Sequence, residues 1–192
     1  MPWARRGGRR SPIAKPGAPD HTPPRPGLSG RRRMPVSEIT VRIARLEPMR
    51  VASVQAFSEN PERDAWEKLQ LWAEAQGYLD RPEEHPVFGF NSPGPGRGGQ
   101  RYGYEFWIRV GPEAAAEGGV EFKDFPGGLY AVTTCKLLGD PTGSVMEVWQ
   151  KLWTWAQQNG HHWRKTHELE KLHDPRAPAE ELVLDLYLPI ES

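Results

Sequence analysis

The chain contains one pattern of tryptophan, leucine, alanine and glycine twice. Trp, Leu, Trp, Ala and Gly stand at positions 66, 69, 72, 73 and 77, and the same types recur 83 residues later. A strand-like segment before each copy also matches, at an offset of 79: Val41, Leu46 and Ala52 correspond to Val120, Phe125 and Ala131. Self-similarity at a fixed offset is the signature of a repeated structural unit. We therefore expect two pseudo-symmetric halves, with a cleft where they meet.

Each repeat predicts the same order of elements: two strands, a helix and two strands. Apolar and polar residues alternate over 38–46, as in a half-buried strand. Asn60 and Pro61 suit the start of a helix, and Gly77 suits its end. The expected elements are strands at 38–46, 51–57, 87–90 and 101–110 with a helix at 60–77, then strands at 120–125, 129–137, 168–172 and 181–190 with a helix at 140–160.

This order predicts an α+β fold made of two pseudo-symmetric units. We expect antiparallel sheets with the helices packed on one face, and a central cleft between the repeats. The first repeat spans about 38–111 and the second about 118–191. The large apolar residues of the second helix recur at helical spacing, so we interpret its tryptophans mainly as core residues.

Charge separates the first 33 residues from the rest. They carry nine basic residues and one acid, whereas residues 34–192 carry 16 basic and 24 acidic residues. Residues 1–37 are rich in Arg, Pro and Gly, and we expect them to form a disordered tail before a folded domain at 38–192. The tail is either a basic arm for nucleic acid or an acidic partner, or a passive extension. The acidic domain argues against nucleic acid as its own ligand.

The single cysteine, Cys135, excludes an internal disulfide and fits a cytoplasmic protein. No apolar run approaches the roughly 20 residues of a membrane span, so no membrane partner is expected. Four histidines lie near Glu168 and Glu170, but none of them forms the i, i+4 pair of a zinc-binding helix. We therefore predict neither a metal site nor a cofactor.

Two strands carry a carboxylate and a large aromatic residue on one face. Glu105 and Trp107 alternate with an apolar row at 104, 106 and 108 that suits packing under a helix. Asp185 and Tyr187 repeat this arrangement at an offset of 80. If these faces line the cleft, they form an aromatic box with two acids for a flat or cationic ligand. The alternative is that both acids are ordinary solvent-facing residues of their strands.

A carboxylate walled by aromatic rings is expected to have a raised pKa, as a general acid or base requires. Under the box interpretation, this makes Glu105 the candidate catalytic residue if the protein is an enzyme.

Four segments together resemble a known family: 41–54, 102–107, 125–132 and 185–190. They are similar to the GyrI-like small-molecule-binding domains, also known as bacterial transcription activator effector-binding domains, over roughly 38–191. The resemblance implies two fused units around a cleft that binds lipophilic, often cationic, compounds, with Glu105 at the position of the cleft acid. Some members of the family resemble hydrolases that open cyclopropane-bearing natural products, and others resemble inhibitors of DNA gyrase.

The resemblance leaves three functions open. The protein binds a hydrophobic or cationic aromatic small molecule as a sensing, sequestering or resistance protein, or it is a hydrolase, or it is a gyrase-inhibitor type module with a protein partner. The tail cannot form the helix-turn-helix of the family's transcription regulators. In this family the segment after the second helix borders the pocket, so Glu168 and Glu170 are either cleft residues or part of a solvated charge run. The expected ligand contacts are Glu105, Trp107, Tyr187, Tyr130, Tyr102, Asp185 and Glu168.

Overall fold

The computed structural model describes residues 39–94, 101–114, 118–137, 141–178 and 181–191, with only the backbone of 141–144. The chain divides into two units, Met1–Met34 and Pro35–Ser192, and all described residues belong to the second. The expected disordered tail at 1–37 therefore lies outside the described residues.

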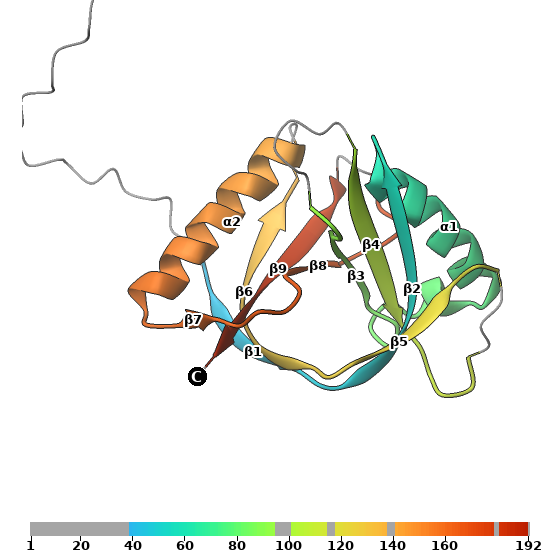
Figure 1. Cartoon of the computed structure of the whole chain (residues 1–192), viewed down its shortest axis with the longest axis horizontal. Helices are drawn as coiled ribbons and strands as arrows, with labels where there is room; N and C mark the ends of the chain where they lie inside the picture. Colours follow the sequence, from blue (N-terminus) through green and yellow to red (C-terminus); the bar gives the residue numbers. More distant parts are fainter. Residues whose placement is uncertain (1–38, 95–100, 115–117, 138–140, 179–180, 192) are drawn as a thin grey trace, which may run out of the picture. The chain divides into compact units, whose positions relative to one another are not determined.

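The predicted order of elements is confirmed in both repeats (Figure 1). The first repeat comprises β1 (Arg42–Leu46), β2 (Met49–Ser58), α1 (Pro61–Ala75), a short 3-10 helix (Tyr78–Asp80), β3 (Val87–Asn91) and β4 (Tyr102–Arg109). The second comprises β5 (Glu121–Phe125), β6 (Gly128–Lys136), α2 (Pro141–Gln158), β7 (His162–Trp163), β8 (Leu169–Leu172) and β9 (Val183–Glu191). The two-residue strand β7 was not expected.

The boundaries of α1 follow from its terminal residues. Pro61 occupies the first helical turn, where its missing N–H is not needed, and Glu62 and Asp64 place negative charge near the N-terminus. Asn60 stands at the N-cap, but its side chain makes no capping hydrogen bond. Gly77 follows the helix with a φ of +71°, a left-handed conformation that glycine adopts without strain.

The strands form one continuous antiparallel sheet rather than a separate sheet for each repeat. Its order is β1-β6-β9-β8-β3-β4-β2-β5, and β7 pairs with β9 outside this path. The first strand of each repeat is exchanged, because β1 pairs with β6 and β5 pairs with β2. The halves join where β3 pairs with β8 through Phe88–Lys171 and Gly89–Glu170. Each half therefore takes its edge strand from the other repeat.

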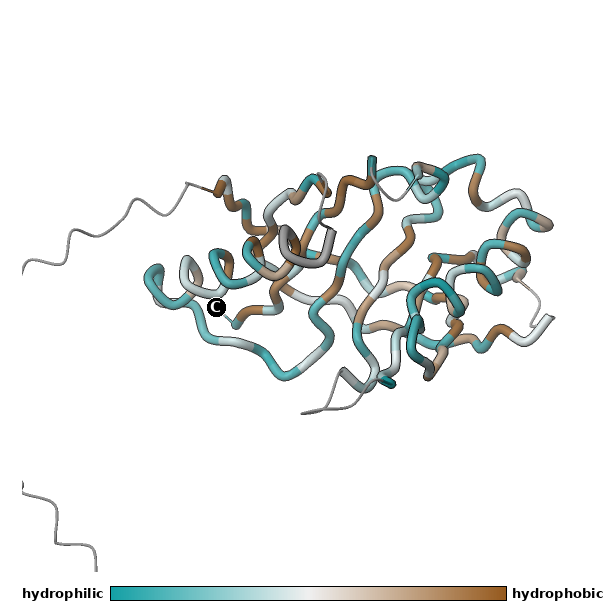
Figure 2. The backbone as a smooth tube through the Cα atoms, turned by 90° about the horizontal axis from the view of Figure 1, so that it is seen from above, coloured by the Kyte–Doolittle hydropathy of each residue, from teal (hydrophilic) through white to brown (hydrophobic). Residues whose placement is uncertain are grey.

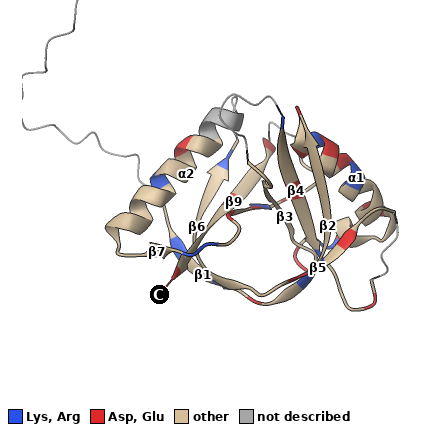
Figure 3. Cartoon of the chain, viewed as in Figure 1, with Lys and Arg blue, Asp and Glu red and all other residues tan. Residues whose placement is uncertain are grey.

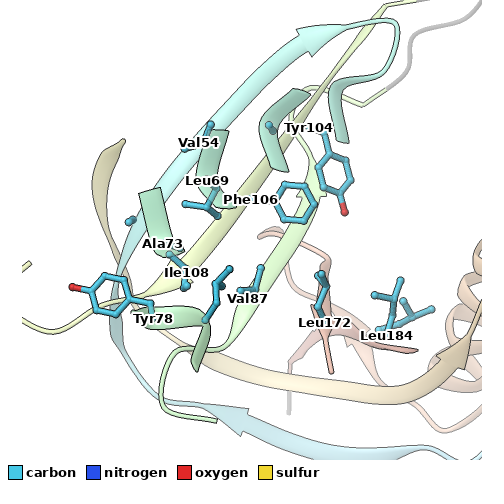
Figure 4. Packing of buried hydrophobic residues seen from close by; sticks show 14 of the residues in the cluster. Val54, Leu69, Ala73, Tyr78, Val87, Tyr104, Phe106, Ile108, Leu172 and Leu184 are labelled. Atoms are coloured by element: carbon cyan, nitrogen blue, oxygen red, sulfur yellow. The ribbon is translucent and has the colours of Figure 1, made fainter. Parts of the chain in front are cut away.

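Both helices pack on one face of the sheet. The predicted rows under the helices are confirmed, since the side chains at 104, 106, 108, 184, 186 and 188 all belong to one buried cluster with Leu69 of α1 and Leu152 of α2. Figure 4 shows the part of this cluster around Leu69, Tyr104, Phe106 and Ile108. Hydrophilic and hydrophobic residues are interspersed along both helices, as in helices that pack with one apolar face (Figure 2). Charged residues of both signs mark α1 and are few on α2 (Figure 3).

The face away from the helices carries a second buried cluster. The sheet curls, and the cluster contains several aromatic side chains from both repeats. Its buried members are Val51, Phe88, Phe90, Trp107, Phe125, Tyr130, Val132, Leu169 and Tyr187. This second core occupies the face on which the sequence predicted a ligand box.

Candidate functional site

The aromatic residues of the predicted box pack against one another. Trp107 lies 4.6 Å from Phe90 and 5.5 Å from Phe125 between ring centroids, both from strands that flank the box. The ring centroid of Tyr187 lies 5.8 Å from that of Tyr130, and Tyr187 also contacts the ring of Phe88 on β3. Trp107, Tyr130 and Tyr187 are each at most 5 % exposed. These three residues come together as predicted, but as a packed core.

Glu105 is buried beside this core and already has three donors. Its Oε1 accepts hydrogen bonds from Ser53 Oγ at 2.6 Å, Trp107 Nε1 at 2.6 Å and Lys123 Nζ at 2.5 Å. Burial raises the pKa of Glu105, but the hydrogen bonds from Lys123, Ser53 and Trp107 outweigh it and leave the pKa below its usual value. The expectation of a raised pKa here is therefore wrong, because the aromatic neighbour Trp107 is itself a donor and Lys123 neutralises the charge.

Asp185 has a corresponding but separate environment in the other repeat. It accepts hydrogen bonds from Arg42 Nη2 at 2.8 Å and Thr134 Oγ1 at 2.7 Å, and His173 Nε2 lies at 3.0 Å. Burial raises the pKa of Asp185, but these partners together lower it below its usual value. In both repeats the cation comes from the exchanged strand, Arg42 from β1 and Lys123 from β5. The two acids thus form two distinct ion pairs instead of one two-acid site.

Tyr102 lies on the opposite face of β4 from Trp107. Its hydroxyl donates to Glu62 of α1, with distances of 2.7 and 2.8 Å to the two carboxylate oxygens. Burial, this hydrogen bond and the charge of Glu62 raise the pKa of Tyr102 to about 12. The structure therefore places Tyr102 with α1 and not with the other predicted wall residues.

The seam between the repeats contains a cavity of about 210 Å³ with a different set of acids. Strand β3 of the first repeat contributes to it, together with α2, β7, β8 and the loop before β8 of the second repeat. Its lining residues are Phe90, Asn91, Trp149, Trp163, Thr166, His167, Glu168 and Glu170. Of the predicted ligand contacts, only Glu168 lines this cavity.

Glu170 is the most constrained acid of this cavity. Oε2 accepts a hydrogen bond from Tyr104 Oη at 2.7 Å, and Oε1 accepts one from Trp149 Nε1 at 3.1 Å. Burial raises the pKa of Glu170 and outweighs these two hydrogen bonds, and the charge of Glu62 raises it further. Tyr104 comes from β4 and Trp149 from α2, so both repeats hold the carboxylate.

Gly89 on β3 makes this arrangement sterically possible. It pairs with Phe106 on one side and with Glu170 on the other, so Tyr104 must reach across it to meet the carboxylate. A β-carbon at position 89 would lie 2.7 Å from Tyr104 Cε1 and 2.9 Å from Phe106 Cε1. An isolated glycine within a strand often marks such a close approach, and this was the available sequence signal for the site.

The charges around this cavity are not balanced internally. Among the described residues, neither Glu168 nor Glu170 forms an ion pair, whereas Glu105 and Asp185 both do. No lysine or arginine of the described segments lines the cavity, and burial lowers the pKa of His167, which favours its neutral form. Carboxylates among aromatic rings attract cations, so this geometry suits a small positively charged aromatic molecule.

Two further features of the described residues concern cofactors and membranes. Within these ranges, no group of three or more His, Cys, Asp or Glu residues is placed to hold a metal ion. Neither described helix combines the length and the apolar character that a membrane-crossing helix needs.

The family model described as "integron-associated effector binding protein" matches residues 42–190. The chain belongs to this family. The resemblance to the GyrI-like effector-binding domains is thereby confirmed, and the match covers both repeats. No curated protein sequence matches this chain.

Solved structures with the same fold include two of EcmrR. EcmrR in a complex with DNA has a TM-score of 0.59 and 16 % identity, and the match covers 80 % of this chain and 57 % of that one. The C-terminal domain of EcmrR alone has a TM-score of 0.57 and 15 % identity, and the match covers 80 % of this chain and 98 % of that one. A hydrolase from Listeria innocua has a TM-score of 0.54 and 12 % identity, and the match covers 80 % of this chain and 93 % of that one. At these identities the comparisons establish the α+β fold, and this chain spans just over half of the EcmrR chain bound to DNA.

Proposed function

We propose that this protein binds a cationic or hydrophobic aromatic small molecule in the cavity around Glu170, as a sensing, sequestering or resistance protein. One observation carries the proposal: Glu170 is a half-buried carboxylate in an aromatic cavity without an ion-pair partner among the described residues. Membership of an effector-binding family supports it.

The neighbours of Glu170 favour recognition of a cation. Each carboxylate oxygen already accepts one hydrogen bond from an uncharged donor, which fixes the group without neutralising it. An oxygen of this kind keeps a further lone pair that a ligand can use. Trp149 and Trp163 supply aromatic surface beside the charge, and a cation between rings and a carboxylate gains from both.

Glu105 is less suited to bind or transform a ligand. Its charge is neutralised by Lys123, and its lowered pKa disfavours the protonated form that a general acid needs. We therefore assign ligand recognition to Glu170, and we do not extend the proposal to hydrolysis by Glu105 or to a gyrase-type protein partner.

The proposal can be tested with two probes of the same shape. Phenyltrimethylammonium and tert-butylbenzene differ in one atom of the head group, nitrogen in place of carbon, and thus in charge. Calorimetric titrations of the full chain should show that the cation binds about tenfold more tightly, equivalent to ~1.4 kcal/mol. Glu170→Gln should reduce this preference, because it removes the charge of Glu170 and retains the size of the side chain.

The matched control is Glu105→Gln, which removes the charge of the buried acid that the sequence analysis suggested as a ligand contact. It should leave the preference for the cation unchanged, with circular dichroism confirming that both variants are folded. If Glu105→Gln instead abolished the preference and Glu170→Gln retained it, the ligand site would lie at Glu105 and the proposal would be wrong.

A further inference from the structure

The Glu170 cavity contains a second carboxylate, that of Glu168. We propose that the cavity selects aromatic ligands with two positive charges, such as bis-ammonium or bis-amidinium compounds, with one cationic group at each glutamate. This inference rests on the proposed function and specifies the chemical class of its ligand.

The spacing of the two acids defines the spacing of the two cations. Glu168 and Glu170 are two residues apart where the chain enters strand β8, and both line the same cavity. A strand rises about 3.3 Å per residue, which separates their α-carbons by roughly 6.6 Å. This separation is close to that between two aminomethyl groups at opposite ends of one benzene ring. A single-ring dication therefore suits the pair of acids.

The walls of the cavity suit the ring between those charges. Trp149 lies at the Glu170 end, where its indole N–H donates to the carboxylate. Phe90 is a buried wall residue, and the exposed His167 lies against it with its ring centroid 4.4 Å from that of Phe90. Trp163 is 44 % exposed, so its ring is available at the rim. Aromatic walls of this kind bind a flat ring and also favour its attached cations.

Charge balance distinguishes a dication from a monocation. No lysine or arginine lines the cavity, and neither acid has an ion-pair partner in the described part of the chain. A bound monocation leaves one carboxylate without a partner in a partly desolvated site, which is costly. Burial raises the pKa of Glu168, and the charge of Glu170 raises it further, consistent with two acids that repel each other. A dication removes this repulsion.

The test compares 1,4-bis(aminomethyl)benzene with 4-ethylbenzylamine, in which a methyl group replaces one ammonium. Both are titrated calorimetrically into the full chain, into Glu168→Gln and into the control Glu121→Gln, an exposed acid on the edge strand β5. We expect the diamine to bind the unmodified protein about tenfold more tightly. Glu168→Gln should reduce this ratio to about two, the statistical advantage of two equivalent ammonium groups, and Glu121→Gln should leave it unchanged.

The remaining outcomes separate this inference from the proposed function. If both amines bind equally well and Glu168→Gln weakens them equally, selection of dications is refuted while a cation site at Glu170 stands. If neither amine binds, the cavity is not a cation site, and both the proposed function and the inference from it fail.

Discussion

Replacing Gly89 with alanine should detach Tyr104 from Glu170. The added β-carbon would lie 2.7 Å from Tyr104 Cε1 and 2.9 Å from Phe106 Cε1, and closer still to the Tyr104 hydroxyl. Carbon atoms at van der Waals contact are about 3.5–4.0 Å apart, so both rings must move. The tyrosine hydroxyl can no longer reach Glu170 when its ring is displaced from above β3.

The size of the effect follows from two contributions that partly overlap. Forcing an extra methyl group into a packed core costs typically 1–3 kcal/mol. A hydrogen bond to a charged group is worth about 1.5–3 kcal/mol, and Glu170 loses one of its two. Because moving the ring relieves the overlap as it breaks the bond, the two costs are not additive. We expect the free energy of unfolding to fall by about 2–3 kcal/mol.

The measurement is a urea titration followed by tryptophan fluorescence, with Gly94→Ala as a control. Within the part of the chain that the structure describes, a β-carbon at Gly94 would meet only Asn91 Cβ, at an ordinary 3.6 Å. The loss caused by Gly89→Ala should be smaller in a Tyr104→Leu background, since one of the two clashing rings is then absent and the contact with Phe106 remains. If Gly89→Ala proved as stable as Gly94→Ala, the close packing of Tyr104 over β3 would be refuted.

Further predictions concern the ion pairs and pH. Lys123→Met should lower the free energy of unfolding by about 1–2 kcal/mol, because it leaves Glu105 buried without its cation. The loss is limited because Lys123 is partly exposed and solvent screens the ion pair. As a control, Lys136→Met at an exposed position should change the free energy of unfolding little. Glu105 and Asp185 have lowered pKa values, so their stabilisation is complete above the usual values of 4.5 and 3.8 and is lost as pH falls through the lower folded-state values. Urea titrations across this acidic range should show a shallower loss for Glu105→Gln than for the unmodified protein, and equal slopes would contradict the assignment. Glu170 affects stability in the opposite direction. Because its pKa is raised, its ionised form lowers the free energy of unfolding at neutral pH. As pH falls towards 4.5, the unmodified protein should therefore become more stable relative to Glu170→Gln.

Part of the candidate site was within reach of sequence reasoning. The repeat pointed to the seam between the halves, and the family resemblance suggested that the segment around Glu168 and Glu170 borders the cleft; in the structure both residues line the cavity at the β3–β8 seam. The alternation of β4 correctly put Glu105 and Trp107 on one face and Tyr104 on the other. The alternation could not show that the Glu105 face is filled by rings from four other strands, β3, β5, β6 and β9, because it contains no information on what packs against a face.

The sequence by itself determined the order of the elements and which residues face the helices. These depend on local periodicity, since side chains alternate along a strand and recur every 3.6 residues along a helix. Only the tertiary structure decided which acids are neutralised. The exchange of β1 and β5 brings Lys123 to Glu105 and Arg42 to Asp185, whereas the partners of Glu170 among the described residues are the uncharged donors of Tyr104 and Trp149. Partners that lie 18 to 143 residues apart in the chain are set by strand pairing across the whole sheet, and no local pattern encodes that pairing.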